Sequence, residues 1–137
     1  MLRDFYQIMY LLVNTYRQEE PDAKQYQSSK ALQRLSPITE YMKKHYAEEL
    51  SLHSLAAQFG YSPEHLSRMF QKYAFMNYKY YLSSIRLEHA MEEMQTGEKT
   101  LSEIAASVGF SDSRAMAKAF VKHFGMLPSE YLKISKK

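Results

Sequence analysis

The 137-residue chain has no cysteine, and it contains only four glycines and four prolines. The absence of cysteine excludes disulfides, thiolate metal sites and cysteine nucleophiles. No run approaches the roughly 18 consecutive apolar residues that a membrane-spanning helix needs. The short apolar run at 8–13 is interrupted by a tyrosine and lacks a small-residue cleavage site, so no signal peptide is expected. We therefore expect a cytoplasmic protein without a membrane partner.

Charge and composition narrow the fold class. The formal net charge is +3 and the pI is about 9.0. These values permit nucleic-acid binding but do not establish it, because binding depends on whether the positive side chains cluster on one surface. The hydrophobic fraction of 45% is ordinary for a globular protein. No Asn-Gly or Asp-Gly pair stands between alternating runs, so hairpins are not expected. These features predict an all-α protein.

One pattern occurs twice, about fifty residues apart. Residues 55–62 are Leu-Ala-Ala-Gln-Phe-Gly-Tyr-Ser, and residues 104–111 are Ile-Ala-Ala-Ser-Val-Gly-Phe-Ser. A helix rich in polar residues follows each copy, and the second copy has one residue more between its glycine and its inward phenylalanine. This order is typical of a helix-turn-helix, whose second helix enters the DNA major groove. The sequence predicts two such units, at about 51–73 and 100–124, joined by one long helix.

Capping residues and stop signals set the expected helix boundaries. After residue 30 we expect helices at 37–48, 52–59, 63–73, 78–95, 101–108, 112–124 and 128–131. The expected N-cap residues are Ser36, Ser51, Ser62, Thr100 and Ser111. The side chains expected to face inward include Leu66, Met69, Phe70, Leu82, Ile85, Ala90, Met94, Met116 and Phe120.

Residues 2–18 have the pattern of an amphipathic helix, with an apolar stripe that another surface must cover. The stripe consists of Leu2, Phe5, Met9, Leu12 and Tyr16. Residues 18–30 are polar and contain Pro21, which is typical of a linker. We expect residues 1–30 to be the remnant of a sensor or dimerisation module in a longer protein, and 31–137 to form the DNA-binding domain.

The two units resemble the C-terminal DNA-binding domain of the AraC/XylS family of bacterial transcription regulators, over roughly residues 38–133. The most specific matches are residues 104–112, Phe120, Phe124, Gly125 and 128–131. The first half adds residues 55–56, 60–62, 66–68, Phe70, 81–82, 86–87 and Ala90. The resemblance implies seven helices in two subdomains bridged by the long helix. It also implies two recognition helices that enter adjacent major-groove segments on one face of promoter DNA.

Further partners follow from the same resemblance. A small-molecule sensor module usually precedes this domain in the family, so any effector would bind a sensor domain missing from this chain. The surface opposite the recognition helices would contact RNA polymerase, as in an activator. The stripe at 2–16 would serve a homodimer or the sensor module.

Some positions depart from the family pattern. Phe75 replaces the usual glycine after the first recognition helix, which predicts a reshaped turn. Leu127 replaces a common threonine cap before the last helix. Ala115 and Ala117 leave few long side chains on the second recognition helix, so this helix is expected to read fewer bases.

The resemblance places the base-reading side chains on the outward faces of the two recognition helices. They are Glu64, His65, Ser67 and Arg68 in the first helix, and Ser113, Arg114, Ala117 and Lys118 in the second. Arg68 can donate two hydrogen bonds to the O6 and N7 atoms of guanine. Glu64 either accepts a hydrogen bond from a cytosine amino group or only balances Arg68. The alternative for the whole set is a solvated helix face.

Lysines and helix N-termini are expected to contact phosphates, which positions a protein on DNA without reading its sequence. The expected residues are Ser62, Lys72, Asn77, Ser111, Lys122 and Ser129. The capping residues among them satisfy helix ends whether or not DNA is bound.

Catalysis is not expected. The five histidines lie on different predicted helices without a His-Glu-x-x-His spacing, and no glycine-rich phosphate loop occurs. We therefore expect no catalytic residue, no metal and no cofactor. His89 with Glu92 and Glu93 is expected to form a solvated face.

Two alternatives concern binding. The 12 tyrosines suggest a stacking platform for single strands, but the inward positions of Tyr61, Phe70 and Phe120 favour core packing. The competing function is a helical interaction or dimerisation module with weak or non-specific DNA binding.

Overall fold

The computed structural model describes the backbone of residues 23–135 and the side chains of residues 33–135. Within this range the secondary structure consists only of helices, so the all-α prediction is confirmed. They are α2 (Ala23–Lys44), α3 (Leu52–Phe59), α4 (Pro63–Met69), the π-helix η1 (Phe70–Ala74), α5 (Tyr78–Thr96), α6 (Leu101–Ser107), α7 (Ser113–Phe124) and α8 (Pro128–Ser135). No helix in the described range is long and apolar enough to cross a membrane. The predicted helix at 2–18 and its stripe lie outside the described residues.

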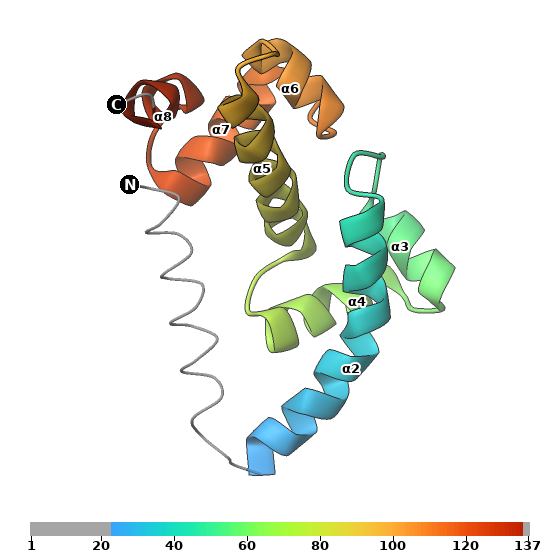
Figure 1. Ribbon diagram of the computed structural model, residues 1–137. Coiled ribbons are helices and arrows are strands. Elements are labelled where there is room, and N and C mark those ends of the chain that lie inside the picture. Colours follow the sequence, from blue (N-terminus) through green and yellow to red (C-terminus); the bar gives the residue numbers. More distant parts are fainter. Residues whose placement is uncertain (1–22, 136–137) are drawn as a thin grey trace.

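Two separate hydrophobic cores lie at the two ends of α5 (Figure 1). The first core belongs to a unit made of α2, α3, α4 and η1, and the second to a unit made of α6, α7 and α8. Along α5, Leu82 and Ile85 enter the first core, whereas Leu87, Met91 and Met94 enter the second. The predicted arrangement of two subdomains bridged by the long helix is therefore confirmed.

The periodic apolar positions explain both cores. Phe70 and Phe120, one in each unit, are completely buried. Their rings therefore pack in the cores and are not available to stack on the bases of a single strand. The other predicted inward residues that are buried are Leu66, Met69, Leu82, Ile85, Ala90, Met94 and Met116. Burying such side chains stabilises each unit by roughly 1.5–3 kcal/mol per large residue.

Helix α2 begins earlier than predicted. Ser36 was expected to cap a helix starting at Pro37, but both residues lie inside α2, and the predicted linker is wrong from Ala23 onward. The buried residues Leu35, Ile38 and Met42 form one apolar stripe that continues across the proline. Pro37 itself is exposed, so the carbonyl that loses its intrahelical donor lies on a side that water reaches.

The sequence predicted Ser111 as the N-cap of α7, but the N-cap is Asp112. Asp112 Oδ1 accepts a hydrogen bond from the Ala115 N–H at 2.7 Å. The extra residue of the second copy moves the helix start by one position. The other caps, Ser51, Ser62 and Thr100, are confirmed.

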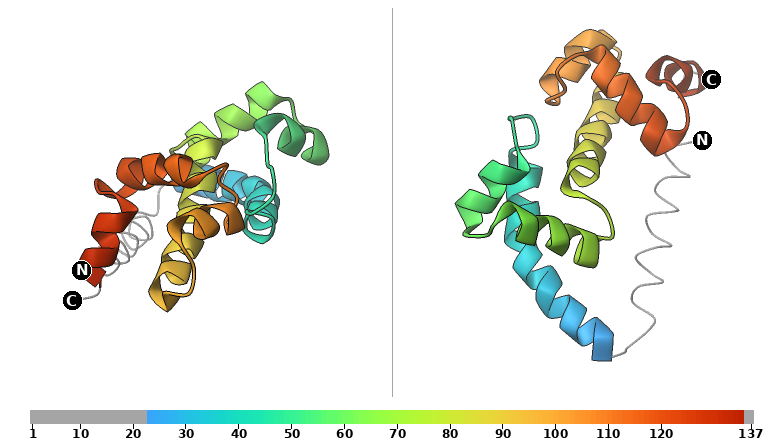
Figure 2. Two further views of the ribbon diagram at one scale, coloured as in Figure 1. Left: turned by 90° about the horizontal axis from the view of Figure 1, so that it is seen from above. Right: turned by 180° about the vertical axis from the view of Figure 1, so that it is seen from behind.

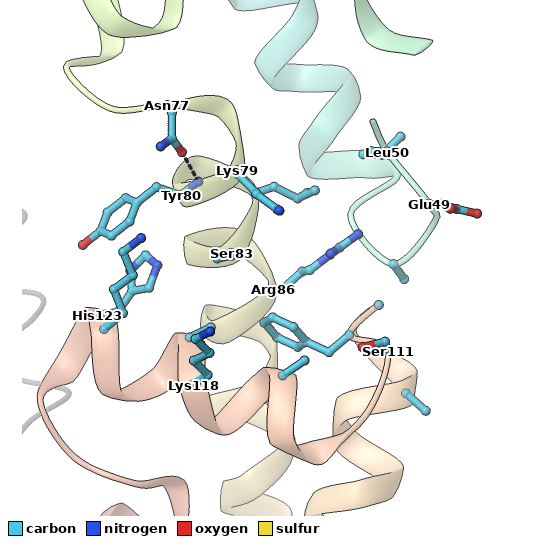
Figure 3. A pocket seen from close by; sticks show the side chains of 18 residues that line it. Glu49, Leu50, Asn77, Lys79, Tyr80, Ser83, Arg86, Ser111, Lys118 and His123 are labelled. Carbon is cyan, nitrogen blue, oxygen red and sulfur yellow. Dashed lines mark hydrogen bonds between the residues drawn. The ribbon is translucent and has the colours of Figure 1, made fainter. Parts of the chain in front are cut away.

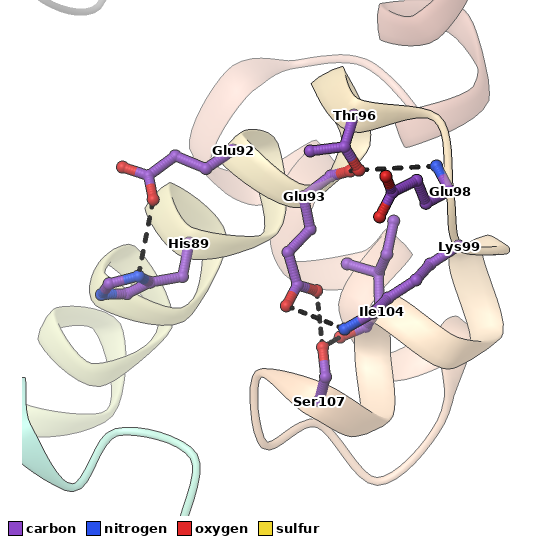
Figure 4. Close-up of polar contacts among 8 residues, drawn as sticks. All are labelled: His89, Glu92, Glu93, Thr96, Glu98, Lys99, Ile104 and Ser107. Atoms are coloured by element: carbon purple, nitrogen blue, oxygen red, sulfur yellow. Dashed lines mark hydrogen bonds and ion pairs between the residues drawn. The ribbon is translucent and has the colours of Figure 1, made fainter.

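The polar face of α5 at 89–93 is only partly solvated as expected: Glu92 is exposed, whereas His89 and Glu93 contact neighbouring segments (Figure 4). Glu93 accepts a hydrogen bond from Ser107 Oγ at 2.5 Å and pairs with Lys99 Nζ at 3.3 Å. His89 pairs with Glu92 at 3.8 Å, and its ring stacks on Tyr46 with centroids 3.9 Å apart. These contacts fix α6, and the turn that follows α2, against α5.

Candidate nucleic-acid interface

Helix α4 is the second helix of the first helix-turn-helix unit. Ser62 Oγ accepts a hydrogen bond from the His65 N–H at 3.1 Å, and Pro63 occupies the first helical position. Buried Leu66 and Met69 anchor the inner face of α4. Because of helical spacing, this anchoring turns the predicted base-reading residues outward. Three of them, Glu64, His65 and Arg68, are exposed, and Ser67 is half-buried.

The π-helix η1 continues α4 to Ala74. Lys72 is exposed on it, with Nζ 5.4 Å from the centroid of the Tyr73 ring. The segment ends at Phe75, which adopts a left-handed conformation with φ +58° and is 72% exposed. Phe75 therefore adopts the left-handed backbone conformation that a glycine would adopt at this position. This conformation is strained for an L-residue with a side chain.

Helix α7 is the equivalent helix of the second unit. Met116 and Phe120 are buried, and the opposite face presents exposed Arg114 and Lys118. The predicted Ser113 and Ala117 are half-buried. The carboxylate of the Asp112 cap adds a negative charge to the N-terminus of α7, where the first unit has the neutral Ser62.

The two helices are arranged as one DNA-facing surface requires. Seen from above, α4 and α7 lie along the same edge of the molecule, with α6 and the far end of α5 on the other side (Figure 2). α5 connects the two units, and in this arrangement the outward faces of α4 and α7 lie on the same side of the molecule.

A cleft of about 850 Å³ lies between the two units (Figure 3). Lys118 and His123 point into it from α7, and Lys79 and Tyr80 line it from the first turn of α5. Its charged lining consists of Lys79, Arg86, Lys118 and Lys122 against Glu49. The cleft therefore has an excess of positive charge, which α5 and α7 both supply.

The histidine of the cleft does not add to this charge. Burial, with a smaller contribution from the charge of Lys122, lowers the pKa of His123 to about 4. The neutral ring stacks on Tyr80, with centroids 3.9 Å apart. Lys122 Nζ lies 5.8 Å from the centroid of the same tyrosine ring, so this lysine lines the cleft next to the histidine.

The structure brings some of the predicted phosphate-binding residues together and keeps others apart. Asn77, Ser111 and Lys122 line the cleft, together with the predicted base-reading Lys118. Ser62, Lys72 and Ser129 lie elsewhere and do not line it. Asn77 Oδ1 accepts a hydrogen bond from the Tyr80 N–H at 2.7 Å, so its side chain caps α5.

The expected weak cap before α8 keeps half of a capping box. Glu130 Oε2 accepts a hydrogen bond from the Leu127 N–H at 3.2 Å. Leu127 has no hydroxyl to accept in return from the first turn of α8, which is the bond that a threonine would supply. Ser129 is exposed in the first turn of α8.

Sequence reasoning missed Lys79 and the structural role of Arg86. Lys79 follows Asn77 by two positions, so its place in the first turn of α5 was predictable, but its position opposite α7 was not. Within the range of described side chains, no group of three histidine, aspartate or glutamate residues is placed to hold a metal ion.

Comparisons with known proteins agree with this geometry. The family described as helix-turn-helix domain matches residues 55–134, which is more than half of the chain. YijO of Escherichia coli K12, an HTH-type transcriptional regulator, is 36% identical over 94 residues, covering 69% of this chain and 33% of YijO. The chain is also similar to an HTH-type transcriptional regulator of Staphylococcus aureus, and it covers 13% of the length of that protein.

Two solved structures have the same fold. A regulator with an AraC-type DNA-binding domain from Chromobacterium violaceum aligns with a TM-score of 0.68 and 25% identity, covering 77% of this chain and 94% of that one. The DNA-binding domain of the global transcriptional factor AdpA, in complex with a target DNA, aligns with a TM-score of 0.68 and 22% identity, covering 74% and 91%.

Proposed function

The chain belongs to the AraC-type helix-turn-helix family of DNA-binding transcription regulators, and on that premise we propose that it binds an asymmetric promoter site by placing α4 and α7 in two adjacent major-groove segments. The observation that carries the proposal is the arrangement of two separately packed units with α4 and α7 along one edge (Figure 2). Adjacent groove segments on one face of B-DNA are about one helical turn apart. The DNA-binding domain of AdpA, which has the same fold, was solved in complex with a target DNA, which supports DNA binding by this fold.

Base reading in this proposal is unequal between the two helices. Arg68 is the main reader in α4, because its exposed guanidinium can bond to guanine O6 and N7 together. Glu64, His65 and Ser67 assist it. In α7, Arg114 and Lys118 read the second groove segment. Ser113 and Ala117, on the same helix, lie close to the bases.

Phosphate contacts then fix the protein along the DNA. In the first unit, Lys72 and Ser62, which caps α4, contact phosphates. In the second unit, Ser129 in the first turn of α8 contacts a phosphate. Lys122 and Lys79 on the two sides of the cleft, with Asn77 and Ser111, face the backbone between the two groove segments. Such contacts raise the affinity for every sequence alike and weaken with salt.

The remaining partners follow from the proposal that residues 1–30 are the remnant of a sensor or dimerisation module. A sensor module before α2 would bind a small-molecule effector, and residues 2–16 would contact that module or a second copy. The surface away from α4 and α7 would contact RNA polymerase in an activator.

A second candidate function is a helical interaction module with weak DNA binding. Two observations favour it: the short side chains of Ala115 and Ala117 on α7, and the Asp112 carboxylate at its N-terminus. A deletion of residues 2–16 separates the roles, since dimers would be lost while DNA binding stays intact if the two functions are independent.

The decisive experiment is selection of bound sequences from a random duplex library with this purified chain at two salt concentrations. Two enriched blocks about one helical turn apart are expected. A single block would mean that α7 only holds the backbone. Weak binding without a motif, lost steeply with salt, would overturn sequence-specific reading and favour the interaction module.

A further inference from the structure

Three parts of the chain that are far apart in sequence meet between the two cores. They are the turn 45–50 after α2, Arg86 in the middle of α5, and Gly109 in the turn before α7. Arg86 Nε donates to the Tyr46 carbonyl at 2.7 Å, and Arg86 Nη2 donates to the Glu48 carbonyl at 2.9 Å. Figure 3 shows the Arg86 side chain extending from α5 toward this turn. One guanidinium therefore ties the turn between α2 and α3 of the first unit to the connecting helix.

Gly109 brings the second unit to the same place. A Cβ atom at this position would lie 2.9 Å from Arg86 Nε, 2.9 Å from the Tyr46 carbonyl oxygen and 3.0 Å from Ala47 Cα. Real Cβ atoms essentially never come that close to backbone, so a side chain at 109 would push the two units apart. The Arg86 guanidinium also lies 5.8 Å from the centroid of the Phe110 ring, on the same turn.

The first copy of the repeat supplies the comparison. Gly60 is the counterpart of Gly109 and shares its positive φ, +79° against +102°. Yet nothing lies within 4 Å of a Cβ built at Gly60. Chain conformation therefore explains a glycine at both positions, but only at Gly109 does close packing between units also require it.

Tyr46 completes the contact. It packs against both hydrophobic cores, and its ring stacks flat on His89 of α5 with an interplanar angle of 1°. The turn after α2 is thus shared by the two units, whereas α5 is the only covalent element between them.

We infer that Arg86 is a positioning residue which, with Gly109 packed against it, fixes the orientation of α7 relative to α4. Two cores joined by one helix would otherwise bend and twist about that helix. The lateral contact removes this freedom and so sets the spacing between the two groove segments that the protein accepts. The consequence for DNA rests on the proposed function, but the fixed orientation itself does not.

The absence of cysteine allows a direct test without DNA. Cysteines introduced at exposed Gln58 in α3 and Ser102 in α6 would carry spin labels, and pulsed electron resonance would measure the distance distribution between the units. A single narrow distribution is expected for the otherwise unchanged chain. Arg86→Met and Gly109→Ala should broaden or shift it, and Arg86→Lys should restore part of the narrow form.

Matched controls separate this effect from general destabilisation. Arg34→Met removes an exposed arginine from α2, and Gly60→Ala adds a methyl group in open space. Both should leave the distribution unchanged, and circular dichroism should show that every variant keeps its helices. A broad distribution in the unchanged chain, or an equally narrow one in helical Arg86→Met, overturns the inference.

The DNA experiment uses the selected duplex with its two blocks moved apart or together by one base pair. The unchanged chain should lose about tenfold in affinity for the altered spacing, whereas Arg86→Met should lose about twofold or less. Equal losses would overturn the link to spacing. If the unchanged chain selects no motif, the proposed function fails, while the distance measurement still decides the role of Arg86.

Discussion

The imidazole ring of His123 lies stacked on the phenol ring of Tyr80, with centroids 3.9 Å apart and planes inclined by 18°. This contact joins α7 to the first turn of α5 beside the cleft. His123 Nε2 is buried and has no hydrogen-bond partner among the described residues. Protonation would place a second positive charge beside Lys122 on a half-buried ring whose Nε2 has no acceptor in the described part of the chain, so the ring stays neutral above about pH 4.

Stability should therefore fall on acidification. The pKa of His123 is lowered from 6.5 to about 4 by burial and then by Lys122, so the unfolded chain binds more protons than the folded one between these values. The contribution is complete above pH 6.5 and is lost as the pH falls toward 4. For a half-buried ring we expect about 1–2 kcal/mol after solvent screening.

Thermal unfolding from pH 4 to 7.5 would measure this effect, with His123→Phe as the reference because it keeps a ring on Tyr80. The stability difference between the two proteins should change with pH in this window. A difference that stays constant across the window would refute the assigned environment of His123.

Arg68→Ala and Lys72→Ala should affect DNA binding in different ways. Loss of Arg68 should relax the preference at one base pair and cost about 1–3 kcal/mol on the preferred sequence. Loss of Lys72 should weaken all sequences alike and reduce the salt slope by about one. Titrations of matched and single-mismatch duplexes at several salt concentrations separate the two. Equal weakening on every duplex by both changes would contradict the division of roles.

Asp112 offers a test of charge at the start of α7. Asp112→Ala should cost about 1 kcal/mol of stability, because the Ala115 N–H loses its acceptor. Asp112→Ser keeps a cap of the kind that Ser62 supplies in the first unit, so stability should change by only a few tenths of a kcal/mol. Removing the carboxylate should strengthen binding to DNA about threefold at low salt. Unchanged affinity for Asp112→Ser would place the N-terminus of α7 away from phosphates.

Phe75 is the described non-glycine residue with positive φ, at +58°. Phe75→Gly should raise the stability by about 0.5 kcal/mol, because relief of the left-handed strain exceeds the added entropy of the unfolded chain. Urea unfolding measures the change, and Phe75→Asn, which tolerates this conformation, should lie between. A loss of stability in both variants would show that contacts of the Phe75 ring outweigh the strain.

The sequence was sufficient for features that depend on near neighbours. Ser51, Ser62 and Thr100 cap their helices through donors only three residues away, and Phe70 and Phe120 follow from helical periodicity. The repeat then revealed two helix-turn-helix units, and the resemblance named their family. Local signals failed where a longer-range effect was stronger: the buried stripe through Leu35 and Ile38 carries α2 across Pro37.

What the sequence determined by itself is the identity of the helices, their inward faces and the presence of two units. Only the tertiary structure decided how these units meet. Arg86 and Tyr46 are 40 residues apart, and Gly109 approaches both from a third segment. The stacking of His123 on Tyr80, and the cleft that both line, likewise join residues of two different helices. Capping and periodicity act within one or two helical turns, whereas contacts between the units arise only when distant segments pack together.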